Sequence, residues 1–253
     1  MTMLRAIITA FACFSTIPMP PIPWDDANMR YMMAAFPLVG AVIGALCMLW
    51  AHLGTTLGFG PLLMGVGYAL IPVIVSGGIH LDGLADVIDA ESSHASPKRK
   101  REILKDPHIG AFAAIGTCSY LMAYAALAGE LGNQQVASLA CIPIISRCLS
   151  GLVTVTLKTS KSEGMLATEQ ASADARVVRI VLTIVWLAAT GALVATGSAA
   201  ALLATFSAIA VLFAIRRLAM TQYGGMSGDL AGCLLELVEL AMLASIVLVG
   251  KVW

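Results

Sequence analysis

Long apolar runs separated by short polar segments are the feature that most restricts the fold of this chain. Such runs recur over residues 31–53, 61–76, 109–129, 136–157, 180–196, 199–215 and 230–249. A helix needs about 20 predominantly apolar residues to cross a bilayer. Charged residues make up only 12% of the chain, against about 25% in soluble domains. The sequence therefore predicts an all-α fold, a polytopic integral membrane bundle of about seven spans that forms a single transmembrane domain over residues 1–253.

Residues 3–17 form a further apolar run that is too short for a full span. We expect a short re-entrant or interfacial helix there, because the prolines that follow between positions 18 and 23 cannot continue a helix. Gly40 and Gly44, in the first span, favour close approach by another helix, although such spacing also arises by chance in a glycine-rich chain. The formal net charge is zero, so we expect no nucleic-acid partner.

The basic residues predict the orientation in the membrane. Nearly all Lys and Arg residues lie in the loops over 18–31, 91–107, 158–179 and 216–229, and the opposite loops over 54–60, 130–135 and 196–199 hold none. Loops rich in Lys and Arg stay in the cytoplasm. We therefore expect an integral protein of the bacterial cytoplasmic (inner) membrane. The same assignment puts four aspartates on the cytoplasmic side, where we expect the active site: Asp82, Asp86, Asp89 and Asp229.

An acidic stretch follows the second run, with the sequence Gly-Gly-Ile-His-Leu-Asp-Gly-Leu-Ala-Asp-Val-Ile-Asp-Ala-Glu over residues 77–91. If it is helical, Asp82, Asp86 and Asp89 lie on one face, because they are spaced at i, i+4 and i+7. Carboxylates so placed repel one another unless a cation lies among them, and hard oxygen ligands suit Mg²⁺, Mn²⁺ or Ca²⁺. The alternative is the solvated acidic start of a helix.

A glycine-rich segment before the last run is a second candidate site. Gly224 and Gly225 would let a phosphate or a second helix approach closely. Asp229 and Glu236 follow on one helical face, so both can point toward whatever lies beside that segment. A structural turn with Asp229 as the N-cap of the last helix is the alternative.

Arg147 is a basic residue within the fourth run. Ionisable groups at membrane depth are costly and are therefore functional candidates. The guanidinium group can bind a phosphate with two hydrogen bonds. It can equally form an internal ion pair with Glu236 or Glu239 of the last run, and the sequence leaves both roles open.

Polar residues just before the third run are the last candidates. Lys105, Asp106 and His108 lie there, and His80 precedes the acidic residues. Either histidine can act as a general base, contact a phosphate or serve as a hydrogen-bonded structural residue. Acidic metal ligands together with basic residues indicate chemistry on a phosphorylated substrate. The residues thus predict a metal-dependent phosphoryl or nucleotidyl transferase that acts on a bulky or amphiphilic acceptor in a membrane.

Four segments resemble the cobalamin synthase (adenosylcobinamide-GDP ribazoletransferase) family. Residues 77–86 resemble its GG-x-HLDGLAD signature, with Asp89 at the position of its third aspartate. Residues 105–110 are similar to its D-x-x-x-G element, and residues 224–229 with Glu236 to its GG-x-x-GD…E element. Residues 14–20 resemble its N-terminal F-x-x-(x)-P-x-P run. The four segments follow one another in the expected order and span most of the chain.

The resemblance implies a reaction. α-Ribazole or its 5′-phosphate attacks the phosphate attached to cobinamide in adenosylcobinamide-GDP. GMP leaves, and the product is adenosylcobalamin or its 5′-phosphate. Mg²⁺ is the implied cofactor, and the corrin substrate is large and amphiphilic, which suits a cleft that faces the membrane. Membrane lipid is a further expected partner, and a homo-oligomer is left open.

Charge and placement, taken together with the resemblance, indicate roles for the site residues. We expect metal binding by Asp82, Asp86 and Asp89, with Asp229 as a further candidate ligand. We expect catalysis by Asp82, Asp86 and Arg147, and by His80 as the candidate base, with direct activation of the hydroxyl by the metal as the alternative. We expect cofactor and phosphate binding by Lys105, Asp106, Gly224, Gly225 and Glu236. The chain departs from the family at Ala90, where glycine is frequent, and at His108, where arginine is frequent. The second departure leaves the phosphate role of that position open.

Two other functions fit the acidic cluster. A CDP-alcohol phosphotransferase is also a membrane bundle with an Asp-rich helix, but its signature requires Asp-Gly-x-x-Ala-Arg. Here Asp82-Gly83 is followed by Leu-Ala-Asp-Val, so the Ala-Arg pair is missing. A cation transporter or channel is the other alternative, because it can use the same carboxylates, and ion flux without any corrinoid would support it.

Overall fold

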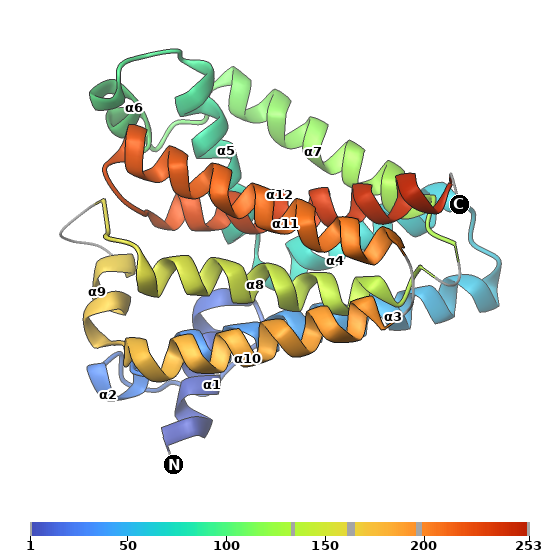
Figure 1. Cartoon of the computed structure of the whole chain (residues 1–253), viewed down its shortest axis with the longest axis horizontal. Helices are drawn as coiled ribbons and strands as arrows, with labels where there is room; N and C mark the ends of the chain where they lie inside the picture. The colour runs from blue at the N-terminus through green and yellow to red at the C-terminus, as the bar shows by residue number, and fades with distance from the viewer. Residues whose placement is uncertain (1, 133–134, 161–164, 196–198, 252–253) are drawn as a thin grey trace.

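The computed structural model describes residues 2–132, 135–160, 165–195 and 199–251, and most of these residues are helical (Figure 1). Helices follow one another throughout these described residues, and an isolated β-bridge pairs Thr159 with Met226. In chain order the elements are α1 (Thr2–Phe14), α2 (Asp26–Met29), α3 (Met32–Leu57), α4 (Pro61–Ser76), α5 (Ile79–Ser92), α6 (Pro97–Ile103), α7 (Ala111–Gly129), α8 (Ser138–Thr156), α9 (Met165–Ser172), α10 (Ala175–Val194), α11 (Ala199–Leu218), the π-helical turn η1 (Ala219–Tyr223) and α12 (Gly228–Gly250).

Among the described residues, six helical segments are each long and apolar enough to cross a membrane: α3, α7, α8, α10, α11 continued by η1, and α12. Helices α4 and α5 are together also long and apolar enough, but the chain bends by 99° where they meet. They add a seventh span only if this bent pair is taken as one broken span. The long helices run alongside one another in Figure 1. The predicted all-α polytopic membrane bundle is confirmed.

Two glycines account for the sharp bend between α4 and α5. Gly77 and Gly78 have φ angles of 66° and 79°, in the left-handed region that glycine adopts without steric cost. The Gly78 N–H still donates to the Val73 carbonyl at 3.0 Å, which closes the end of α4. The acidic stretch therefore begins a new helix instead of extending the span. The stretch is helical, which is the condition under which its three aspartates share one face.

The short helix α1 packs against α3. Beyond it, the Thr16 N–H donates to the Val75 carbonyl at 2.8 Å, and the Thr16 hydroxyl donates to the Ile74 carbonyl at 2.8 Å. These bonds tie the segment after α1 to the end of α4. With 13 residues, α1 is too short to cross a bilayer, as predicted. Its re-entrant or interfacial placement stays a prediction.

The polar loops gather at one end of the bundle. The segments that carry α2, α6 and α9, and the turn before α12, lie at one end of the long helices, and the turn between α3 and α4 lies at the other (Figure 1). The first group contains the loops in which the sequence concentrates its Lys and Arg residues. Their common location agrees with the predicted alternation of the loops. That this end faces the cytoplasm stays a prediction.

Helices α3 and α8 pack closely through Gly40 and Gly44. A Cβ atom at Gly44 would lie 2.7 Å from the Ala140 carbonyl oxygen, and one at Gly40 would lie 2.7 Å from the Pro143 carbonyl carbon. Cβ atoms essentially never come so close to another backbone, so glycine is needed at both positions. The close helix contact predicted from the spacing of these glycines is confirmed.

We expect Gly40→Ala to destabilise the bundle, because the added methyl group meets the α8 backbone and the two helices must move apart. Overpacking of this kind costs about 1–3 kcal/mol. Thermal unfolding in detergent should give a lower Tm than in the wild type. Gly191→Ala is the matched control, because Gly191 is exposed on α10 with nothing within 4 Å of its Cβ position. Equal Tm values for the two variants would contradict this packing of α3 on α8.

Candidate active site

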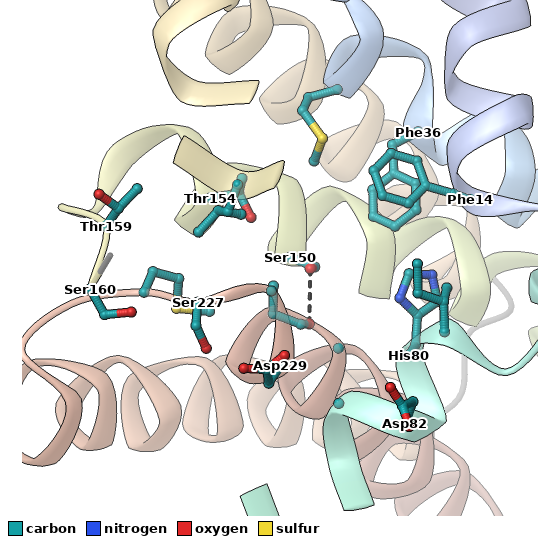
Figure 2. Close-up of a pocket in the computed structure, with 18 of the residues that line it drawn as sticks. Phe14, Phe36, His80, Asp82, Ser150, Thr154, Thr159, Ser160, Ser227 and Asp229 are labelled. Atoms are coloured by element: carbon teal, nitrogen blue, oxygen red, sulfur yellow. Dashed lines mark hydrogen bonds between the residues drawn. The ribbon is translucent and has the colours of Figure 1, made fainter. Parts of the chain in front are cut away.

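A pocket of about 280 Å³ lies among α5, α8 and α12, and α1, α3, α9 and the loop after α8 complete its walls (Figure 2). Two carboxylates, one imidazole, two aromatic rings and several hydroxyl groups give it its chemical character. They belong to Asp82, Asp229, His80, Phe14, Phe36, Ser150, Thr154, Thr159, Ser160 and Ser227. The bundle thus brings together polar groups from segments that are far apart in the sequence.

Two glycines bring α5 and α12 into close contact beside this pocket. A Cβ atom at Gly83 would lie 2.9 Å from the Asp229 Cα atom, and one at Gly232 would lie 2.8 Å from the His80 carbonyl oxygen. A glycine of each helix therefore packs against the backbone of the other helix. As a result, Asp82 and Asp229 line the same pocket from different helices (Figure 2).

The three aspartates of α5 have different surroundings. Asp82 is exposed and lines the pocket, whereas Asp86 and Asp89 are half-buried further along the helix and do not line it. The Asp89 carboxylate lies against Gly110, just before α7. Within the described part of the chain, no three His, Cys, Asp or Glu side chains are grouped so that they could hold a metal ion. The pocket joins Asp82 with Asp229 instead.

The glycine-rich segment before α12 packs against protein backbone. Gly224 ends η1 with a φ of 75°, and a Cβ atom at Gly225 would lie 2.6 Å from the Thr159 carbonyl carbon. The N–H and the carbonyl of Met226 both form 2.8 Å hydrogen bonds with the backbone of residues 158–160. Gly224 and Gly225 do not line the pocket. Their conformation instead lets the 158–160 loop pair with this segment, and that loop contributes hydroxyl groups to the pocket.

Ser227, and not Asp229, caps α12. The Ser227 hydroxyl accepts a hydrogen bond from the Leu230 N–H at 3.2 Å. Asp229 lies within the first turn of the helix and lines the pocket, at a helix end where negative charge is favourable. The alternative in which Asp229 is the N-cap is therefore wrong, and its carboxylate belongs to the candidate site.

Arg147 forms an internal ion pair, which is one of its two predicted roles. Its guanidinium Nη1 lies 2.9 Å from Glu239 Oε1, and both side chains are only 1% exposed. The Ser146 hydroxyl donates to the same carboxylate oxygen at 2.7 Å. The Arg147 guanidinium also lies over the Phe36 ring, 5.7 Å from its centroid. Arg147 is not among the pocket residues, and its contacts link α8 to α12.

Two further carboxylates tie helices to one another. Glu236 is buried and accepts a hydrogen bond from the Tyr120 hydroxyl at 2.5 Å, which links α12 to α7. Glu91, near the end of α5, accepts hydrogen bonds from Lys100 Nζ and from the Tyr223 hydroxyl, both at 2.7 Å. This second set fastens α5 to α6 and η1. Neither carboxylate lines the pocket, so Glu236 lies apart from Asp82 and Asp229.

The predicted residues before α7 also lie outside the pocket. Lys105, Asp106 and His108 are exposed in the segment between α6 and α7. Asp106 Oδ1 lies 2.7 Å from His108 Nδ1, and this hydrogen bond, together with one from the His108 backbone N–H, lowers the pKa of Asp106 below its usual value. The structure therefore pairs Asp106 with His108 and places neither beside the carboxylates of the pocket.

Sequence reasoning missed most of the aromatic and hydroxyl lining of the pocket. Phe36 lies in a spanning run, where an aromatic residue is ordinary, and Thr159 lies in a loop without a recognisable pattern. Phe14 could have been found from the sequence, because it begins the N-terminal segment that resembles a family motif.

The sequence profile of the cobalamin-5-phosphate synthase family matches residues 6–247. The chain belongs to this family. In this member of the cobalamin-5-phosphate synthase family, three of the four motif segments meet at the pocket. They supply Phe14 from the N-terminal run, His80 and Asp82 from the signature, and Asp229 from the glycine-rich element. The fourth segment contacts α5 through Gly110 and Asp89.

Three relatives named adenosylcobinamide-GDP ribazoletransferase show the extent of the similarity. The protein of Lachnoclostridium phytofermentans is 37% identical over 253 residues, which cover 100% of this chain and 97% of the relative. That of Azorhizobium caulinodans is 33% identical, covering 98% of this chain and 97% of the relative. That of Geobacillus kaustophilus is 32% identical and covers 90% of each chain. No solved structure gives a significant match.

We expect Arg147→Leu to destabilise the protein, because it leaves the Glu239 carboxylate unpaired at 1% exposure. Loss of one partner from a buried ion pair costs about 3–5 kcal/mol, whereas apolar replacement of both partners is tolerated far better. The double variant Arg147→Leu/Glu239→Leu should therefore recover much of the Tm lost in Arg147→Leu, as measured by thermal unfolding in detergent. A stable Arg147→Leu protein that has lost only its activity would favour the phosphate-binding role instead.

Proposed function

We propose that this protein joins adenosylcobinamide-GDP to α-ribazole, or to its 5′-phosphate, and releases GMP. The observation that carries the proposal is the convergence of the family motifs on one pocket that Asp82 and Asp229 line from different helices. The names of the full-length relatives support the same reaction. Neither the family match nor these relatives support a CDP-alcohol phosphotransferase or a cation transporter.

The reaction is a substitution at phosphorus. A ribose hydroxyl oxygen attacks the phosphorus attached to cobinamide and forms a new P–O bond. The bond from that phosphorus to the bridging oxygen breaks, and GMP departs with the bonding electrons. The hydroxyl proton must be removed, and His80 is the proposed base, because its imidazole lines the pocket close to Asp82 (Figure 2).

Mg²⁺ is the proposed cofactor, and the donor set of the pocket fits it. Mg²⁺ in proteins is usually held by one or two carboxylates, several waters and the substrate phosphates, and rarely by an all-protein cage. Asp82 and Asp229 form such a pair of carboxylates. Mg²⁺ bound there would neutralise the charge of the departing phosphate. Asp86 and Asp89 stay predicted ligands, on the strength of their spacing along α5 and of the family resemblance.

We also place the pocket at the cytoplasmic face of a bacterial inner membrane. The loops rich in Lys and Arg lie at one end of the long helices (Figure 1), and the pocket includes Thr159 and Ser160 at the start of one of these loops. Such loops stay in the cytoplasm. An amphiphilic corrinoid would then reach the pocket along the membrane surface, and GMP would leave into the cytoplasm.

The assay follows GMP release by the full chain in detergent or liposomes with adenosylcobinamide-GDP, α-ribazole and Mg²⁺. EDTA provides the metal-free control. Magnesium-dependent GMP formation together with a complete corrinoid is the expected result. Folded protein that releases no GMP, with either α-ribazole or its 5′-phosphate, would refute the proposed reaction.

We expect Asp82→Asn to abolish measurable turnover while the protein remains inserted and folded, because Asp82 is exposed, lines the pocket and is replaced by a side chain of the same size. Loss of a partner outside the first ligand shell already costs roughly 10- to 100-fold in activity, so loss of a direct ligand should cost more. GMP release and Tm are measured together. Glu102→Gln on α6 is the control, since its surface ion pair with Arg99 contributes little. Full activity of Asp82→Asn would remove Asp82 from the site.

A further inference from the structure

Three rings from three separate elements form one wall of the pocket. Phe14 ends α1, Phe36 lies in α3, and His80 lies in the first turn of α5. The centroids of the two phenyl rings are 4.4 Å apart, and the His80 ring lies 5.5 Å from Phe36 and 6.2 Å from Phe14. These distances and tilts are those of favourably packed aromatic groups. The three rings cluster on one side of the pocket in Figure 2.

His80 has a hydrogen-bonding capacity that the described protein does not use. Its side chain is 7% exposed, and its Nε2 atom has no hydrogen-bond partner among the described residues. Buried polar side-chain atoms are nearly always hydrogen-bonded in folded proteins. An imidazole that lines a pocket without such a partner is therefore suited to a ligand that brings a polar atom of its own, such as a sugar hydroxyl.

The other side of the pocket is polar. Thr159, Ser160 and Ser227 lie across from the aromatic wall, and Asp229 lies between them and His80 (Figure 2). Hydroxyl and carboxylate groups match the hydroxyls of a sugar, whereas an aromatic wall matches a flat ring. The pocket is thus aromatic on one side and polar on the other, and a single small molecule can contact both sides.

The size of the pocket limits what it can enclose. Its volume of about 280 Å³ lies just below the range for pockets that bind small molecules, roughly 300–1,000 Å³. The corrin ring with its side chains is far larger than this. A nucleoside is of the right size, and it combines a flat ring with a sugar.

We propose that this pocket binds one nucleoside unit of the reaction, with its base against Phe14 and Phe36 and its sugar toward His80, Asp229 and the hydroxyl groups. The corrin ring then remains outside the pocket. This inference rests on the proposed function, which supplies two nucleosides of the required chemistry. One is α-ribazole, whose base is a benzimidazole, and the other is the guanosine part of adenosylcobinamide-GDP.

The test compares Phe14→Leu with the wild type in three measurements: KM for α-ribazole, KM for adenosylcobinamide-GDP, and inhibition by GMP. Leucine keeps most of the volume of Phe14 but removes the ring on which a base would stack. We expect the constant for one nucleoside to weaken by about three- to tenfold, the size of a lost aromatic contact, and the other to stay within about twofold. Phe14→Tyr, which keeps the ring, should restore the wild-type value.

The affected constant identifies the nucleoside. A higher KM for α-ribazole alone assigns the pocket to the benzimidazole base, and weaker inhibition by GMP with a higher KM for adenosylcobinamide-GDP assigns it to guanine. Phe206→Leu is the control, because Phe206 is 67% exposed on α11 and does not line the pocket. Unchanged constants in folded Phe14→Leu would overturn the inference. If that variant does not fold, Phe36→Leu, which removes the other phenyl ring of the wall, is measured in the same way and decides the result.

Equilibrium dialysis separates this inference from the proposed function. Labelled α-ribazole and labelled GMP are each dialysed against the wild type, Phe14→Leu and Phe206→Leu without the second substrate. Binding of one of them that weakens only in Phe14→Leu supports the nucleoside pocket even if no GMP is released in the assay. Turnover by the wild type with no effect of Phe14→Leu on either ligand would overturn the pocket assignment and leave the reaction in place.

Discussion

Where α5 crosses α12, Gly83 and Gly232 each meet the backbone of the other helix, and the pocket is built around this contact. The crossing is available only because the chain turns by 99° after α4. Backbone polar groups in lipid must be satisfied within the protein, and the two glycines at the turn keep a hydrogen bond to Val73 while they change direction. Residues 79–86 of the family signature therefore point away from the axis of α4 and lie beside the start of α12.

Buried polar contacts fix the position of α12 at this crossing. The ion pair between Arg147 and Glu239 joins α8 to α12, and the hydrogen bond between Tyr120 and Glu236 joins α7 to α12. Both carboxylates therefore lie on the helix that also supplies Asp229. A helix held by polar contacts on two sides has a defined rotation about its axis, which matters for a short carboxylate that must face the pocket.

The helices could be predicted from the sequence more completely than the contacts between their side chains. Apolar runs and repeated glycines are local signals, so the spans and the close contact of α3 with α8 could be predicted from them. The partner of Arg147 could not be predicted, because Glu236 and Glu239 lie one turn apart on α12 and the choice depends on how α8 is rotated. The loop that carries Thr159 and Ser160 joins the pocket through backbone pairing, which leaves no pattern in side-chain types.

The distribution of the pocket residues along the chain has a consequence for biosynthesis. The pocket is lined by Phe14 near the start of the chain and by residues of α12, the last spanning helix that the structure describes. Segments of a membrane protein emerge from the ribosome in order, so α8 enters the bilayer before the carboxylate that neutralises Arg147 has been synthesised. A chain arrested before α12 would therefore hold an unpaired guanidinium within lipid. Such an intermediate differs from the finished protein in a way that a membrane protease or chaperone can recognise.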